Sequence, residues 1–200
     1  GTATMPTILY TRILQLLGDN VLETSLPPDE LDKFDRHRVH KVESFDSTKQ
    51  LITNAVDNNE KVLIVLNTVD KAQEVYALIK ELYPKTPTLL LHSRFRRGDR
   101  NSKEKDLLGL DEKGDSINLF NTSNKACIVV STQIVEVSLD ISFDIMVTET
   151  APLDALVQRF GRINRKRTVE TIGKIKDVYV IAPPETEKEA KPYELETLQR

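Results

Sequence analysis

The sequence predicts an α/β fold, in which a mostly parallel β-sheet is covered by helices on both faces. Two observations lead to this prediction. Segments with strand-like patterns alternate along the chain with segments that have the apolar spacing of helices. In addition, residues 61–66 (KVLIVL), 126–131 (ACIVVS) and 144–149 (DIMVTE) are largely apolar runs, which are typical of strands buried on both faces of a parallel sheet.

The first 36 residues are expected to contain a helix and a connection. Within residues 1–17, the segment 6–17 (PTILYTRILQLL) has the amphipathic pattern of a helix. Residues 18–36 are polar and contain consecutive prolines, so we expect a loop or linker there. The segment 37–42 (HRVHKV) predicts the first strand, and we expect the main domain to cover residues 37–182.

The next elements continue the alternation. A helix is expected over 47–56 (STKQLITNAV), with Ser47 as its N-terminal cap. Beyond strand 61–66, the patterns predict a helix over 70–82, a short strand over 88–91 and a helix over 97–110.

The last third of the chain is expected to hold strands 126–131 and 144–149, an arginine-bearing helix and a final strand over 177–182. The arginine-bearing helix is predicted over residues 151–165 (APLDALVQRFGRINR). Residues 183–200 are charged and begin with two prolines, so we expect a linker leading to an absent C-terminal region.

Composition limits the classes of function. The formal net charge of −3 excludes a globally basic nucleic-acid-binding protein but not a local basic site. The single cysteine, Cys127, rules out an internal disulfide and fits a reducing compartment, so we expect a cytoplasmic protein. We find no signal-peptide pattern and no membrane-length apolar run. Three histidines and one cysteine do not suggest a metal cluster.

Polar residues follow the predicted strands at the edge where α/β sheets bind ligands. These residues are Asn67 and Thr68, the segment from His92 to Phe95, Thr132 and Gln133, and Glu149 and Thr150. Ligand contacts are therefore expected from these positions.

The arginine-bearing helix is predicted to have two faces. Helical spacing places Leu153, Leu156, Val157 and Phe160 on one apolar stripe. The same spacing places Gln158, Arg162 and Arg165 together on the opposite side. Two guanidinium groups and an amide suit a phosphate group, although a solvated basic face remains the alternative.

A phosphate-binding loop is missing from the sequence. The best match to the pattern GxxxxGK[ST] is GLDEKGDS (109–116), where Asp115 replaces the lysine and would repel phosphate. The arginines therefore need a phosphate that another part of a larger protein holds.

Four segments together resemble the motifs of a superfamily-two helicase, in the correct order. GTATMP (1–6) resembles motif III, VLIVLNTVDKA (62–72) motif IV, VVSTQIVEVSLDISFD (129–144) motif V and QRFGRINR (158–165) motif VI. The segment LLHSRFRRGDR (90–100) and details of motifs V and VI resemble the CRISPR-associated helicase–nuclease of type I systems. One departure is Ser138, which replaces a glycine that many helicases of this superfamily have before the motif V aspartate.

The resemblance implies that the chain is the RecA-like second lobe of an ATP-dependent helicase, with residues 1–17 at the end of the first lobe. ATP would lie between the lobes, and the first lobe would supply the phosphate loop and the Mg²⁺ ligands. Arg162 and Arg165 match the arginine fingers, Gln158 would contact the γ-phosphate or water, and Asp140 the ribose. Arg159 would pair with an acid between the lobes or lie on a solvated edge, and Glu136 is unexplained.

Nucleic-acid contacts are also implied by the resemblance. Single-stranded DNA would be contacted by Asn67, Thr68, Ser93, Arg94, Thr132 and Gln133, and motif III residues Thr2, Ala3 and Thr4 would couple ATP to strand separation. The arginines at 94, 96, 97 and 100 would add a basic patch, and Phe95 could stack on a base.

The implied partners are the first lobe, single-stranded DNA, an HD nuclease domain and a CRISPR surveillance complex. The alternatives are a repair or restriction helicase of the same superfamily, or a non-catalytic α/β interaction module.

Overall fold

The computed structural model describes residues 7–20, 27, 30, 35–94, 125–136, 142–165 and 172–199. The chain divides into two compact units, Gly1–Asp35 and Arg36–Arg200. The first unit contains helix α1 (Thr7–Leu17), as predicted, followed by a 3₁₀ turn, η1 (Gly18–Asn20). None of the residues of α1 is buried, and Ile8 has 86% of its surface exposed.

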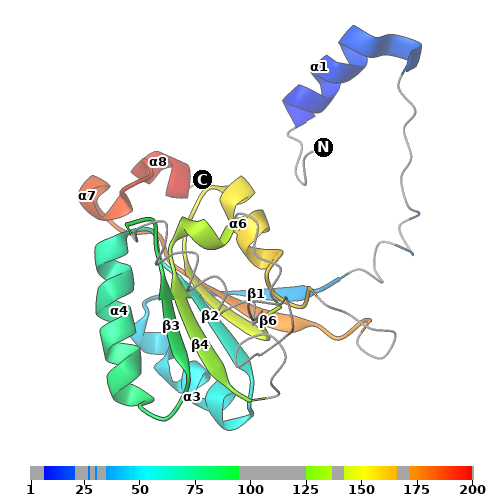
Figure 1. The fold of residues 1–200 in the computed structure, drawn as a ribbon. Helices are drawn as coiled ribbons and strands as arrows, with labels where there is room; N and C mark the ends of the chain where they lie inside the picture. The colour runs from blue at the N-terminus through cyan, green and yellow to red at the C-terminus, as the bar shows by residue number, and fades with distance from the viewer. Residues whose placement is uncertain are drawn as a thin grey trace, which may run out of the picture. The chain divides into compact units, whose positions relative to one another are not determined.

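The second unit is built on a six-stranded sheet in which every pairing is parallel, which confirms the predicted fold class (Figure 1). The strand order is β1-β6-β5-β2-β4-β3. The strands are β1 (His37–Val42), β2 (Lys61–Val65), β3 (Thr88–Leu91), β4 (Cys127–Ser131), β5 (Ile145–Glu149) and β6 (Lys176–Ile181). Each lies within one residue of its predicted bounds.

Three neighbouring strands inside the sheet are apolar and almost completely buried. All residues of β4 are buried, as are four of the five in β2 and in β5, and these three strands are neighbours in the sheet. By contrast, β1 has the polar sequence HRVHKV, lies at the edge of the sheet and contains no buried residue. Strands covered on both faces need apolar side chains on both. The edge position of β1 permits polar residues but does not require them, since the other edge strand, β3, has three buried leucines.

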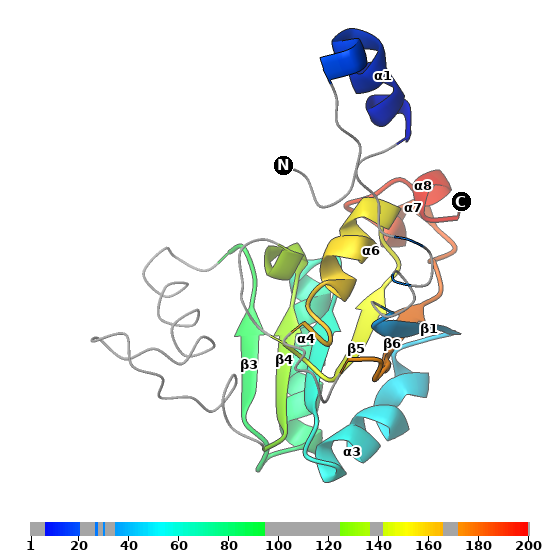
Figure 2. The ribbon, with the colours of Figure 1, turned by 90° about the vertical axis from the view of Figure 1, so that its right-hand side faces the viewer.

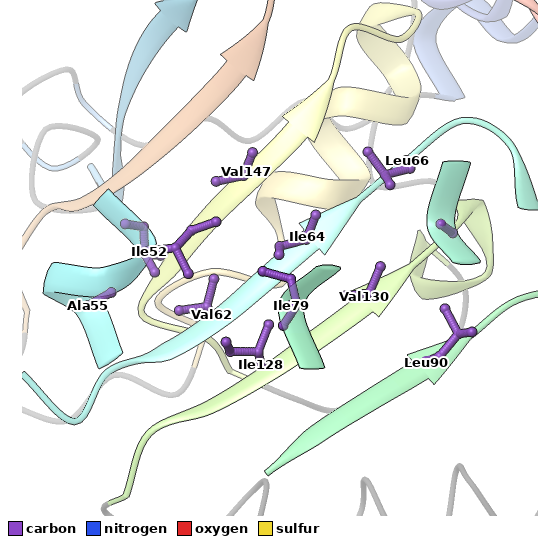
Figure 3. Close-up of a cluster of buried hydrophobic side chains, with 12 residues drawn as sticks. Ile52, Ala55, Val62, Ile64, Leu66, Ile79, Leu90, Ile128, Val130 and Val147 are labelled. Atoms are coloured by element: carbon purple, nitrogen blue, oxygen red, sulfur yellow. The ribbon is translucent and has the colours of Figure 1, made fainter. Parts of the chain in front are cut away.

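Helices cover both faces of the sheet. Helices α3 (Lys49–Asp57) and α4 (Val69–Leu82) supply Ile52, Ala55, Ala72 and Ile79 to one core cluster (Figure 3). Helix α6 (Leu153–Phe160) packs on the other face, where Phe160 contacts a second cluster that contains Phe143 and Ile163. Figure 2 shows α6 in front of the sheet and α4 behind it.

Helix α3 begins two residues later than predicted, and the serine cap is wrong. A 3₁₀ turn, η3 (Asp46–Thr48), comes first, and the Ser47 hydroxyl donates to the carbonyl of Ser44 at 2.6 Å. Helix α3 ends, as many helices do, with a residue in the left-handed conformation. Asn59 has a φ of 60°, and the amides of Asn59 and Glu60 bond back to Val56 and Ala55, which satisfies carbonyls of the last turn.

The single helix predicted over 151–165 is also wrong, because α6 ends at Phe160. Beyond Gly161 the chain turns back, and Ile163 forms a parallel bridge with Phe143. Asn164 then adopts a φ of 51°, and its side-chain amide donates to the carbonyl of Lys174 at 2.6 Å. Asparagine tolerates this left-handed conformation better than most residues.

Residues 183–200 were expected to be a linker, but the structure places two short helices there. They are α7 (Glu187–Ala190), which is capped by the Thr186 hydroxyl, and α8 (Leu195–Gln199). Ala190 and Leu198 are buried, so this segment packs within the second unit. The helix predicted over 97–110 lies outside the described residues. No helix among those described is long and apolar enough to cross a membrane.

Candidate functional site

The polar residues expected at the ligand edge do lie together at the carboxyl ends of the strands. The register aligns Val65 at the end of β2 with Ser131 of β4 and with Thr148 of β5. Asn67, Thr132 and Glu149 come at or just beyond this level, so the end of each central strand contributes a polar side chain to one edge of the sheet.

The direction of the chain connections changes between β5 and β2. From β2 the chain passes through α4 to β3 on one side of the sheet, whereas from β5 it passes through α6 to β6 on the other side. Ligand crevices of open α/β sheets form at such a switch point. In this structure the side chain of Arg159, from α6, reaches the ends of both strands at this point, where it is fully buried.

Each N–H group of the Arg159 guanidinium can be assigned to a partner. Its Nε donates to Glu136 Oε1 at 2.8 Å. Its Nη1 donates to Thr148 Oγ1 at 2.9 Å and to the carbonyl of Glu149 at 3.1 Å. Its Nη2 donates to Asn67 Oδ1 at 3.1 Å and makes a longer contact of 3.4 Å with the Tyr193 hydroxyl. A guanidinium has five N–H donors, so this group is saturated and its charge is paired.

The partners of Arg159 are tied to one another. The carboxylate of Glu149 accepts hydrogen bonds from the backbone N–H of Asn67 and from Lys71 Nζ, both at 2.6 Å. The Asn67 side chain donates to the carbonyl of Thr150 at 2.8 Å, and Gln133 Nε2 donates to the carbonyl of Asn67 at the same distance. We call Asn67, Gln133, Glu136, Thr148, Glu149 and Arg159 the arginine network.

The network overturns the hypothesis for Arg159. We expected an acidic partner between two lobes or a solvated basic edge. Instead Arg159 pairs with Glu136, which lies in the same unit, in the 3₁₀ turn η4 (Gln133–Glu136). The same contact accounts for Glu136, which the sequence alone left unexplained.

The apolar stripe predicted for α6 is rotated in the structure. Leu153 is 75% exposed and Val157 is 39% exposed, whereas Ala155 and Arg159 are buried. A helical pattern read from apolar residues assigns an arginine to the solvent side. Here the arginine takes an inward position because every donor finds an acceptor at the ends of the strands.

Gln158, Arg162 and Arg165 do not share a helix face, because α6 ends before the two arginines. Gln158 is exposed on α6, and Arg165 is exposed just after the turn. Arg162 is only 8% exposed, and its Nη2 donates to the carbonyl of Glu136 at 2.8 Å. The three side chains therefore differ in how readily a ligand could reach them.

The predicted nucleic-acid contacts fall into two groups. Ser93 and Arg94 are exposed beyond β3, and Arg94 forms an ion pair with Asp70 at 2.7 Å. Asn67 and Thr132 are buried, with exposures of 7% and 2%. Two further predicted contacts have internal bonds: Thr68 caps α4 by accepting from the amide of Lys71 at 3.3 Å, and Gln133 belongs to the arginine network.

Several predicted residues lie outside the described residues. These are Thr2, Ala3, Thr4, Phe95, Arg96, Arg97, Arg100, Ser138 and Asp140, and also the segment 109–116. Among the residues that the structure describes, no group of three or more His, Cys, Asp or Glu side chains could hold a metal ion.

A cleft of about 1070 Å³ lies beside the arginine network, at the ends of β1, β6, β5 and β2. Carboxylates outnumber ammonium groups in its lining, which includes Glu43, Glu74, Glu149, Glu185, Glu189, Lys41 and Lys71. Such a lining repels phosphate, so this cleft does not suit a nucleotide phosphate.

Sequence reasoning missed Lys71, Thr148 and Tyr193 as members or neighbours of the network. Lys71 follows Asn67 by four positions and pairs with Glu149 at 2.6 Å, an interaction that only the sheet order could suggest. Tyr193 was missed because its segment was expected to be a linker.

Comparisons with known proteins identify the family. The family model described as CRISPR-associated nuclease/helicase Cas3, C-terminal, matches residues 58–168. A Cas3 nuclease/helicase of Streptococcus thermophilus is 37% identical over 131 residues, which cover 66% of this chain and 13% of that protein. A second one, of Methanothermobacter thermautotrophicus, is 38% identical over 117 residues, 57% of this chain and 12% of that protein.

Solved structures agree with this relationship. A structure titled as a CRISPR-associated protein superposes with a TM-score of 0.68 at 27% identity, covering 88% of this chain and 20% of that one. The ADP complex of T. fusca Cas3 gives a TM-score of 0.61 at 29% identity, with coverages of 84% and 20%. A chain of a CRISPR RNA-guided surveillance complex in a pre-nicking state gives a TM-score of 0.63 at 26% identity. The match covers 91% of this chain and 23% of that one.

The family model covers more than half of the chain. The all-parallel sheet has the RecA-like form found in helicase C-terminal lobes. Domain 2 of the DEAD-box helicase Mss116p, for example, superposes with a TM-score of 0.51 at 20% identity, covering 74% of this chain and 54% of that one. The chain spans only 13% and 12% of the two curated relatives. It therefore belongs to the Cas3 family of CRISPR-associated nuclease/helicases and corresponds to the C-terminal helicase domain of that family.

Proposed function

We propose that this chain is the second RecA-like lobe of an ATP-dependent DNA helicase or translocase that acts in CRISPR interference. In this proposal Arg162 and Arg165 are arginine fingers and Gln158 contacts the γ-phosphate or the attacking water. The first lobe of the same protein holds the phosphate loop and Mg²⁺. The chain alone is then inactive, because an arginine finger needs a phosphate that is already bound.

One observation carries the assignment of the fingers: the backbone that bears them is bonded to the segment that leads into β5. Phe143 donates its amide to the carbonyl of Arg162 at 2.9 Å and accepts from the amide of Asn164 at 3.0 Å. The amide of Arg165 donates to the Ser142 hydroxyl at 3.0 Å. An arginine finger stabilises charge only when it is held in place before the reaction, and this anchoring supports such a role.

Relatives support the choice of nucleotide. The structure similar to this chain at 29% identity is titled as a Cas3–ADP complex. We propose that ATP is the substrate here and that Asp140 contacts its ribose hydroxyls. The acidic cleft beside the arginine network leaves the arginines after α6 as the better phosphate contacts.

We further propose that single-stranded DNA lies along the carboxyl edge of the sheet. Ser93 and Arg94 are exposed there and can reach a phosphate directly, after Arg94 exchanges its exposed ion pair with Asp70. Exposed ion pairs contribute only about 0–1 kcal/mol, so this exchange costs little. Thr68 and Gln133 would contact the DNA from the ends of the strands. Asn67 and Thr132 are buried and their backbone N–H groups donate to Glu149 and Leu91, so they would act by holding this edge in shape. Thr2, Ala3 and Thr4 would couple the lobes.

The partners are proposed by the same reasoning. They are the first helicase lobe, single-stranded DNA, an HD nuclease domain and a CRISPR surveillance complex, since a similar chain occurs in a surveillance-complex structure. The family and its setting lead us to propose a cytoplasmic location.

The test is ATP turnover of the full-length protein with saturating ATP and single-stranded DNA. Arg165→Ala is expected to lower kcat by about 10³- to 10⁵-fold, and Arg162→Ala to have an effect of similar size. Arg38→Ala, which removes an exposed arginine of β1, serves as the matched control. Turnover of both finger variants near that of the control would contradict the proposal, provided that melting temperatures show folded protein.

A further inference from the structure

We propose that Arg159 is a positioning residue for catalysis, which sets the place of Arg162 through Glu136 and does not itself touch ATP. This inference rests on the proposed function. It assigns a role to a buried arginine for which the sequence suggested only an acidic partner between the lobes or a solvated edge.

The first step is that Arg159 cannot serve a nucleotide. Its side chain is fully buried and all five donors are directed at protein acceptors. To reach a phosphate it would have to leave the carboxylate of Glu136, whose side chain is only 14% exposed, without its partner. Breaking a buried ion pair in this way is strongly unfavourable.

The second step is that Arg159 fixes the turn η4. Glu136, the last residue of η4, is held by its carboxylate to Arg159 at 2.8 Å. Gln133, the first residue, is held to the Asn67 carbonyl, and the Asn67 side chain in turn accepts from Arg159 at 3.1 Å. Both ends of the turn are therefore tied to the same guanidinium, one directly and one through Asn67.

The third step is that η4 holds Arg162. The carbonyl of Glu136 accepts from Arg162 Nη2 at 2.8 Å. Glu136 thus bonds Arg159 with its side chain and Arg162 with its backbone. If the Glu136 carboxylate loses its partner, the carbonyl that orients Arg162 is no longer fixed in place.

The same turn adjoins the residues proposed to face DNA. Thr132 and Gln133 immediately follow β4, and Gln133 is part of η4. A shift of this strand end on DNA binding would therefore reach Arg162 through one short turn. Arg159 would keep that turn rigid, so that the DNA side and the ATP side move together.

Lysine cannot replace Arg159 in this role. One ammonium group has three donors on a single nitrogen, whereas the acceptors of Arg159 lie around a planar fork. Arg159→Lys keeps the charge beside Glu136 but loses the simultaneous contacts with Asn67 and Thr148. It therefore tests positioning without leaving a carboxylate unpaired.

The experiment is a double-mutant cycle in the full-length protein with Arg159→Lys, Arg162→Ala and the pair of substitutions combined. We measure kcat and KM for ATP at saturating single-stranded DNA. A displacement of about 1 Å can cost about 10²-fold in rate, so Arg159→Lys should lower kcat by about that factor with KM nearly unchanged. In the Arg162→Ala background the same change should have less than about a twofold effect, because the residue that it positions is already gone.

The outcomes separate this inference from the proposed function. If Arg162→Ala lowers kcat but Arg159→Lys does not, or if the two losses multiply in the combined variant, positioning through Glu136 is wrong and the finger assignment survives. If Arg162→Ala itself leaves kcat unchanged, this inference and the assignment of Arg162 as a finger are both wrong, while the assignment of Arg165 is decided by its own variant.

Folding is controlled separately. Should Arg159→Lys fail to fold, Glu136→Gln provides the same cycle, since it keeps the shape and an acceptor but weakens the tie to Arg159. Arg38→Lys is the control for the chemistry of the substitution on an exposed arginine. A kcat loss of the same size in Arg38→Lys would also overturn the inference.

Discussion

Replacing Arg159 with methionine should destabilise the domain far more than the same substitution at an exposed arginine. Methionine keeps much of the length of the side chain but removes all five donors. Glu136 would be left with a largely buried carboxylate, and the side-chain oxygens of Asn67 and Thr148 would lose a donor. Breaking a buried ion pair by removing one partner costs about 3–5 kcal/mol. For a domain of this size we expect the Tm to fall by roughly 6–20 °C.

The assay is urea unfolding of the chain followed by circular dichroism, with thermal unfolding in parallel. The matched control is Arg38→Met, the same substitution at an exposed site on the edge strand β1. It should change the free energy of unfolding by less than about 0.5 kcal/mol. If the m-value is the same in the variant and the parent protein, a shift of the urea midpoint reports a change in the free energy of unfolding and not in the compactness of the unfolded chain.

A second substitution tests whether the unpaired carboxylate of Glu136 causes the loss of stability. Arg159→Met combined with Glu136→Leu removes both charges, so it should be more stable than Arg159→Met alone. The reasoning is refuted if Arg159→Met costs under about 1 kcal/mol, the contribution of a single ordinary hydrogen bond. It is also refuted if Glu136→Leu brings no recovery, since the cost would then not come from the unpaired acid.

Three further predictions follow from the same structure. The chain alone should fold and show no ATP turnover above a buffer control when Mg²⁺ and single-stranded DNA are present; clear turnover would contradict the two-lobe proposal. Its binding to single-stranded DNA should be weak and independent of sequence, with a log–log salt slope of about 0.7 per phosphate neutralised; tight binding that salt does not affect would contradict this. Burial raises the pKa of the Cys127 thiol from 9.0 to about 12, so the unfolded chain ionises first and stability is lost as the pH rises above 9. Between pH 8 and pH 10 this loss is about 1.4 kcal/mol, and it should be absent in Cys127→Val; equal losses in both proteins would show that the thiol is not its source.

The sheet could be predicted because its signal is local. The runs KVLIV, CIVVS and IMVTE are apolar enough to be buried on both faces, and the structure places β2, β4 and β5 next to one another at the centre. The polar sequence of β1 likewise agrees with its place at an edge. Because the strands are parallel, their carboxyl ends lie at one edge, so the location of the site followed from the strand assignments.

The inward side of α6 could not be predicted because its signal is not local. Periodicity favoured Leu153 and Val157 as inward positions, but both are exposed and Arg159 is buried. An arginine points inward only when hydrogen-bond acceptors converge on it. Here the acceptors come from β5, from η4 and from Asn67, which follows β2. Those segments are distant in sequence, so no window of the chain contains the information.

The end of α6 was missed for a related reason. The helical pattern continues through Ile163, yet Ile163 is buried by pairing with Phe143 and not by helical packing. A buried isoleucine satisfies both interpretations equally well in the sequence. What distinguishes them is Asn164, whose φ of 51° and bond to Lys174 turn the chain toward β6.

Among the described residues, the switch point at the carboxyl edge of the sheet offers no site that suits a nucleotide phosphate. An open α/β sheet offers its ligand crevice at the switch point, and Arg159 fills that position with a cation whose donors are all used. The neighbouring cleft is acidic and includes Glu149. A phosphate placed on either side of the switch point would therefore meet a saturated group or a like charge. We propose that a phosphate instead meets Arg162 and Arg165, which follow α6 on a turn whose backbone is bonded to Ser142 and Phe143. This arrangement suits a lobe that completes a nucleotide site formed mainly by another lobe.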